Sequence, residues 1–154
     1  MLPATTRRVA EQTPDHVNQR IRRATDNRVA RCAAQGPGAI RQRLTELDRE
    51  WDMERALEAN ASAVALVGLG LGALVDRRWF ILPAAVSVFL LQHALQGWCP
   101  PVSLFRRLGI RTSTEIDHER YALKALRGDF EDTAMPQAND GRIVSRTLAA
   151  VRAE

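Results

Sequence analysis

The sequence has only two cysteines, Cys32 and Cys99, among its 154 residues, and it has almost no lysine. Two cysteines do not make a disulfide framework, and the lack of a C-x-x-C pair argues against zinc binding and thioredoxin-like chemistry. Of the 22 basic residues, all but Lys124 are arginine. No basic block is interleaved with aromatic residues, so nucleic acid is not a predicted partner.

The sequence also lacks the motifs of an ordinary enzyme. There is no Ser/His/Asp set, no pair of carboxylates and no metal-ligand spacing, and His16, His93 and His118 lie far apart in the chain. The glycine run from Gly68 to Gly72 has neither the G-x-G-x-x-G spacing nor a following Lys-Ser/Thr, which argues against a nucleotide loop. We therefore predict no enzyme activity, no metal and no cofactor.

Two long uncharged segments dominate the middle third of the sequence. Ala59–Val75 has seventeen residues and Trp79–Phe105 has twenty-seven residues without Asp, Glu, Lys or Arg, and residues 76–78 separate them. About 20 apolar residues in a helix cross a hydrocarbon layer of ~30 Å. Trp79 and Trp98 would then lie near opposite interfaces. The sequence predicts a two-helix transmembrane hairpin, and the alternative is a buried helical hairpin in a soluble protein.

Arginine is distributed unevenly around these segments, which predicts an orientation. The turn carries Arg77 and Arg78. The two flanks carry Arg41, Arg43, Arg49, Arg55, Arg106, Arg107, Arg111 and Arg120. Because loops rich in arginine stay in the cytoplasm, we expect a multi-pass membrane protein with both termini cytoplasmic. No apolar run occurs in the first thirty residues, so a cleaved signal peptide is not expected.

The flanks are predicted to be amphipathic cytoplasmic helices, which makes the expected fold class all-α. We divide the chain into a flexible start (1–12), an amphipathic helical region (13–55), the transmembrane hairpin with a Cys-Pro motif (56–112), a cytoplasmic helix (113–130), and a linker with a short terminal helix (131–154). The expected partners are the lipid bilayer and either a second copy of the chain or an unidentified protein.

Local signals predict where the flanking helices begin and end. Thr13 is expected to cap the first helix, and the Gly-Pro-Gly of residues 36–38 is expected to end it. Thr112–Glu115 predicts a capping box for a helix through Ile116, Leu123 and Leu126, which should stop near Gly128. The second helix has no Gly or Pro before Ala59, so it is expected to run on into the first apolar segment. Its apolar face consists of Ile40, Leu44, Leu47 and Trp51.

Small residues recur on one face of the first apolar segment. They are Ala61, Ala65, Gly68 and Gly72. Such a stripe lets another helix approach closely inside a membrane. The second apolar helix is the natural partner, homodimerisation is an alternative, and a stripe without any role is a third interpretation. Counting outward from Arg77 places Gly68 level with Val86 and Gly72 level with Leu82.

The same count places polar side chains of both segments near the cytoplasmic end. Glu58, Asn60 and Ser62 come level with residues 92–96 of the second segment. The predicted interface layer consists of Asn60, Gln92, His93 and Gln96. Ionisable groups inside a membrane are candidates for function by default. Mutual hydrogen bonds at the interface are the preferred interpretation here, and a proton path is the alternative.

Cys99 lies at the predicted boundary between membrane and cytoplasm, after one helix and before another. The C-terminal dipole of the first helix disfavours a thiolate, whereas the N-terminus of the second, with Arg106 and Arg107 beyond it, favours one. The next arginine falls one residue outside a C-x5-R loop for phosphate or sulfur transfer. A structural cysteine and a reactive thiol both remain open.

The region around Cys99 resembles a known family. The two apolar segments are followed by Gly97-Trp98-Cys99-Pro100 and then by Leu108-Gly109-Ile110-Arg111-Thr112. This order is similar to the YgaP-like transmembrane domain family of small bacterial inner-membrane proteins, in which Gly-x-Cys-Pro precedes Leu-Gly-Ile/Val-x-Thr. The chain departs from the family by placing seven residues between Pro100 and Leu108, which is more than the family usually has.

The resemblance extends from about Glu54 to Thr112. It implies a multi-pass protein of the bacterial inner membrane and says little about activity. Some members carry a rhodanese domain, but this sequence shows none, so sulfur transfer is not implied. The leading hypothesis is a non-enzymatic membrane-anchored interaction or scaffold module. One alternative is a thiol- or sulfur-handling membrane protein that uses Cys99, and another is a soluble helical interaction protein.

Overall fold

The computed structural model describes residue 4 and residues 6–130, and every regular element within them is helical. The elements are α1 (Arg8–Glu11), α2 (Asp15–Gln35), α3 (Pro37–Leu47), α4 (Met53–Leu74), the 3₁₀ helix η1 (Arg77–Phe80), α5 (Ile81–Gln96), α6 (Pro100–Leu108) and α7 (Ser113–Arg127). The predicted all-α class is confirmed for this part of the chain. The linker and terminal helix predicted for 131–154 lie outside the described residues.

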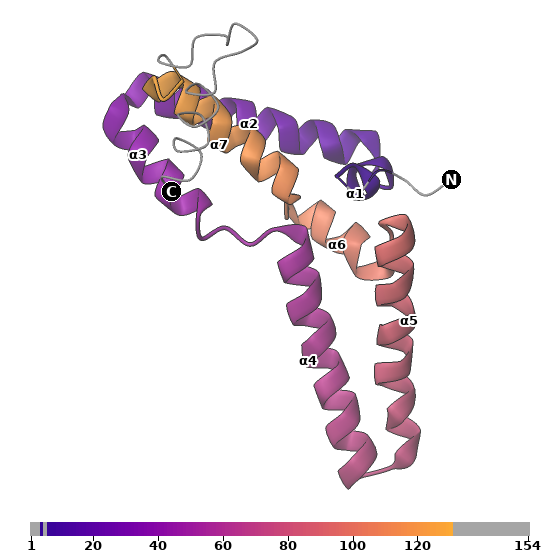
Figure 1. Ribbon diagram of the computed structural model, residues 1–154. Helices are drawn as coiled ribbons and strands as arrows, with labels where there is room; N and C mark the ends of the chain where they lie inside the picture. The colour runs from indigo at the N-terminus through magenta and orange to yellow at the C-terminus, as the bar shows by residue number, and fades with distance from the viewer. Residues whose placement is uncertain (1–3, 5, 131–154) are drawn as a thin grey trace, which may run out of the picture.

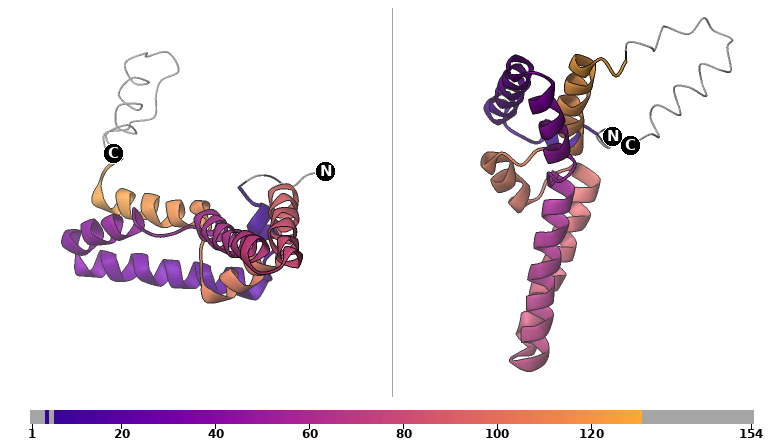
Figure 2. Two further views of the ribbon diagram at one scale, coloured as in Figure 1. Left: turned by 90° about the horizontal axis from the view of Figure 1, so that it is seen from below. Right: turned by 90° about the vertical axis from the view of Figure 1, so that its left-hand side faces the viewer.

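The helices form two parts with different shapes (Figure 1). Helices α2, α3 and α7 contact one another, and with α1 and α6 they make up a helical head. Helices α4 and α5, joined through η1, lie side by side in opposite directions and form a long arm. The right-hand view of Figure 2 shows the arm projecting away from the head.

Two apolar clusters hold these parts together. The first lies between α3 and α7, with Val29 and Cys32 of α2 packed against it; its buried members are Ile40, Leu44, Leu47, Ile116 and Leu123. The second lies where the arm meets the head and joins α1, α4 and α6; its buried members are Val9, Met53, Leu57, Cys99 and Val102. The base of the arm is therefore part of a core shared with the head.

The predicted continuous helix through Trp51 is wrong, because α3 ends at Leu47 and α4 begins only at Met53. Asp52 caps α4 by accepting a hydrogen bond from the Arg55 amide at 2.9 Å, and such a cap starts a new helix. Trp51 is half exposed, and the Arg55 guanidinium stacks on its ring, with Arg55 Cζ 4.6 Å from the ring centroid. The apolar spacing was helical, but the acidic cap decides where the chain turns.

The start of the chain also differs from prediction. Residues 1–12 were expected to be flexible, but Arg8–Glu11 form α1, and Val9 is buried in the second cluster. Thr13 does not cap α2, whose N-cap is Pro14. Instead, the Thr13 hydroxyl donates to the Val9 carbonyl at 2.7 Å and accepts from Arg106. Because the Thr13 hydroxyl bonds to Val9 and Arg106, it is not available to cap α2.

Other predicted helix ends are confirmed. Gly36, at φ 88°, ends α2, and Pro37 opens α3. Thr112 and Glu115 form the capping box of α7 through reciprocal bonds of 3.3 and 2.9 Å. Gly128 ends α7 at φ 90°, a conformation that glycine adopts without strain.

Arg106 is fully buried and ties α6 to α2 and α7. Its guanidinium makes a bidentate pair with Glu115 at 2.6 and 2.7 Å, and it also donates to Asn18 at 2.8 Å and to the Ile110 carbonyl at 3.1 Å. With Thr13 as a further acceptor, every nitrogen has a partner. A buried charge is tolerated only when it is paired in this way.

Arg111 occupies a second buried ionic site, between α7, α2 and the α3–α4 connection. Its guanidinium pairs with Glu50 at 2.8 Å through two nitrogens, and its remaining nitrogen donates to Glu119. Glu119 is completely buried and also accepts from Arg43 at 2.8 Å and from Arg28 at 3.3 Å. Three arginines on different elements therefore converge on one carboxylate.

These arginines change the acidity of the carboxyl groups they surround. Burial alone raises the pKa of Glu119, but the hydrogen bond from Arg43 and the charges of Arg111 and Arg28 outweigh it and hold the pKa below its ordinary 4.5. The same balance of burial against the bond from Arg106 lowers the pKa of Glu115. Both carboxylates therefore stabilise the fold above pH 4.5, and this contribution is lost as the pH falls below that value.

Replacing Glu119 with alanine should lower the free energy of unfolding by about 3–5 kcal/mol, because it removes the buried carboxylate on which Arg28, Arg43 and Arg111 converge. Asp117→Ala, on the exposed side of the same helix, should cost at most about 1 kcal/mol. Denaturation followed by circular dichroism measures both values. The difference between the wild type and Glu119→Ala should also shrink as the pH falls through 4.5. Equal destabilisation by the two variants would contradict this assignment.

Candidate functional site

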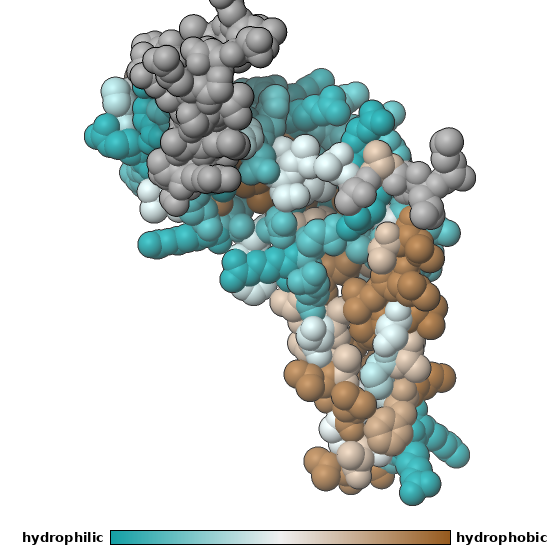
Figure 3. Space-filling model, viewed as in Figure 1, coloured by the Kyte–Doolittle hydropathy of each residue, from teal (hydrophilic) through white to brown (hydrophobic). Residues whose placement is uncertain are grey.

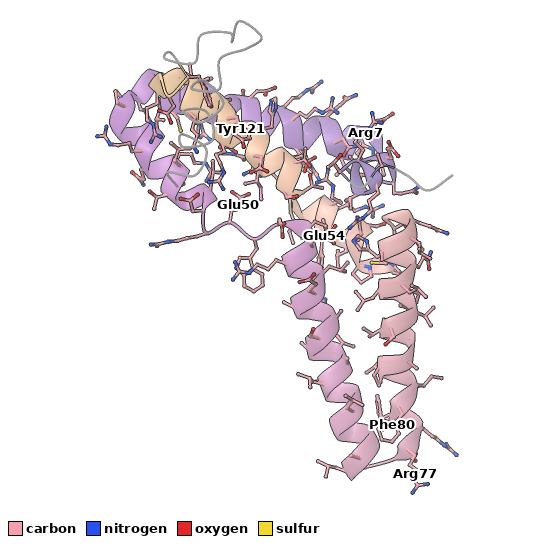
Figure 4. The ribbon with its side chains drawn as sticks, viewed as in Figure 1. Arg7, Glu50, Glu54, Arg77, Phe80 and Tyr121 are labelled. Atoms are coloured by element: carbon pink, nitrogen blue, oxygen red, sulfur yellow. The ribbon has the colours of Figure 1, made fainter. Side chains whose placement is uncertain are left out.

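Two glycines of α4 allow the returning side of the arm to approach closely. An ideal Cβ on Gly68 would lie 2.6 Å from Pro83 Cδ and 2.9 Å from Leu82 Cβ. One on Gly72 would lie 2.7 Å from Cδ1 of Phe80, and Figure 4 shows Phe80 between the two helices near the turn. A real Cβ does not fit at these distances, so the contact requires glycine.

The alanines of the predicted stripe behave differently from its glycines. Ala61 and Ala65 are half buried, whereas Gly68 and Gly72 are buried, and Ala61 lines a cavity between α4 and α5. Gly70 lies off the contact, because no atom comes within 4 Å of an ideal Cβ there. Among the glycines of α4, Gly68 and Gly72 therefore make the close contact, and the helices separate toward the head, as Figure 1 shows.

The register between α4 and α5 differs from the predicted one. Gly68 lies opposite Leu82 rather than Val86. The sequence count took Arg77 as the centre of the turn, but α4 has already ended at Leu74 and η1 belongs to the returning side. The true centre lies earlier in the chain, so every residue of α4 faces an earlier residue of the second segment.

This shift in register also changes the polar layer. His93 is buried, but its side chain pairs with Glu54 and forms no hydrogen bond with the other three predicted members. Asn60 and Gln92 are half buried and Gln96 is exposed, and none of these three side chains forms a hydrogen bond within the described residues. The predicted hydrogen-bonded layer of Asn60, Gln92, His93 and Gln96 is therefore not formed.

Glu54 instead links α1, α4 and α5 at the base of the arm, and Figure 4 shows it in the first turn of α4. Its Oε2 lies 3.1 Å from His93 Nε2, and its Oε1 accepts from Arg8 Nη2 at 2.7 Å. His93 Nδ1 and Arg8 Nε are buried without a hydrogen-bond partner within the described residues. This Arg8–Glu54–His93 group fastens α1 to both helices of the arm. Sequence reasoning missed it, since Arg8 was assigned to a flexible segment.

The Gly97-Trp98-Cys99-Pro100 motif forms the sharp turn from α5 into α6. Gly97 ends α5 at φ 75°, and its missing side chain makes room for α1, because an ideal Cβ would lie 2.6 Å from the carbonyl carbon of Arg8. Trp98 is half buried, and Pro100 opens α6. Gly109 ends α6 at φ 91°. The two glycines therefore set the path of the chain on both sides of α6.

Cys99 is the N-cap residue of α6, and it is only 1% exposed. It packs in the second apolar cluster, between the base of α4 and Val102. Burial raises the pKa of the Cys99 thiol and outweighs the opposing effect of the backbone hydrogen bond from Val102. A buried thiol with a raised pKa is a poor nucleophile, so the environment favours the structural interpretation over the reactive one.

Within the described residues, no group of three or more His, Cys, Asp or Glu side chains is arranged to hold a metal ion. No family model matches the chain, and no curated protein or solved structure matches it. The resemblance to the YgaP-like transmembrane family stays a prediction from the motif around Cys99.

Gly68→Leu should lower the free energy of unfolding by about 1–3 kcal/mol, because the new side chain overpacks against Leu82 and Pro83. Gly70→Leu provides a matched control, since it adds the same side chain where there is open space. Thermal unfolding of the purified protein in detergent compares the two. Equal loss at both positions would show that Gly68 is not a contact between the helices.

Cys99 should react with a maleimide at neutral pH roughly tenfold or more slowly than an exposed thiol, because a thiol must be accessible and ionised to react. The rate for Cys99 is measured in the Cys32→Ser variant. The exposed thiol is supplied by a second variant, in which both native cysteines are replaced and Leu104→Cys is added, since Leu104 is 57% exposed on the same helix. Cys99→Ala should leave the fold intact at modest cost. Labelling of Cys99 as fast as that of the exposed thiol would support the reactive interpretation.

Proposed function

We propose that this chain is an integral membrane protein of the bacterial inner membrane, in which α4 and α5 cross the bilayer as a hairpin. Two helical segments are long and apolar enough to cross a membrane: Met53–Leu74, with 22 residues and a mean hydropathy of 1.5, and Arg77–Gln96, with 20 residues and a mean hydropathy of 1.4. At a rise of ~1.5 Å per residue, each matches the ~30 Å hydrocarbon layer.

The observation that carries this proposal is the exposure of the arm. Only 22% of the apolar window in Met53–Leu74 and 6% of that in Arg77–Gln96 is buried. Leu74 is 87% exposed and Ile81 is 75% exposed, and Figure 3 shows the hydrophobic surface concentrated on the arm below a hydrophilic head. A core hairpin of a soluble protein would bury these side chains, each worth about 1.5–3 kcal/mol. Lipid supplies the apolar surroundings that the head does not.

The distribution of charge supports an orientation with the head in the cytoplasm. Arg77 and Arg78 lie at the tip of the arm, where Asp76 accounts for one opposing charge. The head carries many more arginines, and several are exposed: Arg22, Arg23, Arg31, Arg41 and Arg49. Because arginine-rich segments stay inside, both ends of the chain are then cytoplasmic.

We further propose that the protein is a non-enzymatic interaction or scaffold module, with the head as the part that meets a protein partner or the lipid surface. The buried ionic sites of Arg106 and Arg111 fix the head as a rigid body at the base of the arm. The alternative in which Cys99 carries out thiol or sulfur chemistry is disfavoured by its burial and raised pKa.

The membrane proposal predicts that the protein stays in the pellet after alkaline carbonate extraction of bacterial membranes. Reporters fused to either end should be active only in the cytoplasm, and a reporter inserted after Arg77 should be active only in the periplasm. Release by carbonate would contradict membrane insertion. Retention with a periplasmic reporter signal from either end would contradict the orientation alone.

A further inference from the structure

An apolar cavity lies between the two helices of the arm where they separate toward the head. Its volume is about 120 Å³, and it is open on one side. Helix α4 contributes Ala61 and Val64, α5 contributes Val86 and Phe89, and Cys99 closes the head end. The close contact at Gly68 ends before this level, which is why the space remains unfilled.

Water is a poor occupant for this cavity. Apolar cavities of about 150 Å³ stay dry in proteins and accept small hydrocarbons instead. In the proposed membrane orientation, the cavity lies on the head side of the bilayer, within the arm that acyl chains would surround. Hydrocarbon would restore the van der Waals contacts that the lining side chains lack.

One polar side chain lines this cavity. Asn60 is half buried there and forms no hydrogen bond within the described residues. It lies two residues after the exposed Glu58, which is about 3 Å along the helix, and therefore near the level of the interface. An amide without a hydrogen-bond partner is costly beside hydrocarbon, so this position calls for an acceptor or donor from outside the described fold. The ester carbonyls of glycerophospholipids lie close to this depth and can accept from the Asn60 amide.

We propose that the cavity binds one acyl chain of a glycerophospholipid from the leaflet on the head side, with the ester carbonyl of that chain accepting a hydrogen bond from Asn60. This inference rests on the proposed membrane insertion and gives the lipid bilayer a specific role as partner. A segment of the acyl chain fills the space between α4 and α5 on the head side of the Gly68 contact, so a lipid molecule becomes part of the base of the arm.

The experiment uses the full chain in proteoliposomes that contain a phosphatidylcholine with a photoreactive diazirine in one acyl chain. After illumination, mass spectrometry of peptides locates the adducts. We expect adducts concentrated on the cavity lining, including Val64 and Val86, over the outer-face residues Val67 and Val88, which are 57% and 63% exposed. Labelling of all four residues in proportion to their exposure would overturn the proposal.

Matched variants then test the cavity itself. Ala61→Trp fills it and should reduce cavity labelling by about tenfold, as expected when a side chain blocks an apolar pocket. Ala63→Trp, on the exposed side of the same helix, should leave labelling unchanged. Asn60→Leu should reduce it a few-fold through the lost hydrogen bond. Equal labelling of the Ala61→Trp and Ala63→Trp variants would overturn the proposal.

A carbonate wash of the same proteoliposomes separates two kinds of failure. Protein that stays in the vesicles but is labelled evenly would contradict the lipid site and leave membrane insertion intact. Protein that is released by the wash would contradict the membrane proposal, and the lipid site with it. Retention together with adducts in the cavity supports both.

Discussion

The placement of the arm depends on the buried ionic contacts of Arg111. Its guanidinium joins Glu50, in the connection before α4, to Glu119 of α7, and its backbone carbonyl accepts from the amide of Met53, the first residue of α4, at 2.8 Å. One residue therefore fixes both the core of the head and the point where the arm begins. Removing a member of such a network leaves an uncompensated buried charge, which is far costlier than losing an exposed pair.

This joint separates two regions with opposite physical chemistry. In the head, arginines and carboxylates are paired in the interior, and Arg106 and Glu119 are among its most buried side chains. In the arm, the apolar side chains lie outside, and the interior contact is made by Gly68 and Gly72 with almost no side chain at all. The head packs like a protein folded in water, whereas the exposed apolar surface and the glycine contact of the arm fit the proposal that its helices pack in lipid. The Arg8–Glu54–His93 group lies where the two meet.

Sequence periodicity and turn residues were sufficient for the helical class, for the ends at Gly36 and Gly128, and for the capping box of α7, since these depend on neighbouring residues. They were not sufficient for contacts across the fold. Arg106 and Arg111 were counted as flanking surface charge, and nothing local reveals that Glu115 and Glu119 neutralise them in the interior. The predicted polar layer was wrong for a related reason. Because the turn is centred before Arg77, Glu54 rather than Asn60 lies next to His93.

The central claim is that the arm lies in the hydrocarbon of a bilayer while the head stays in water. Spin labels at single cysteines along α4 and α5, placed in a cysteine-free background in liposomes, measure this through their exposure to oxygen and to a polar nickel complex. The account predicts that oxygen exposure peaks near Val67 and Val88 and falls toward both ends, with a label at Tyr121 exposed mainly to nickel. Nickel exposure of equal size at all three positions would contradict it.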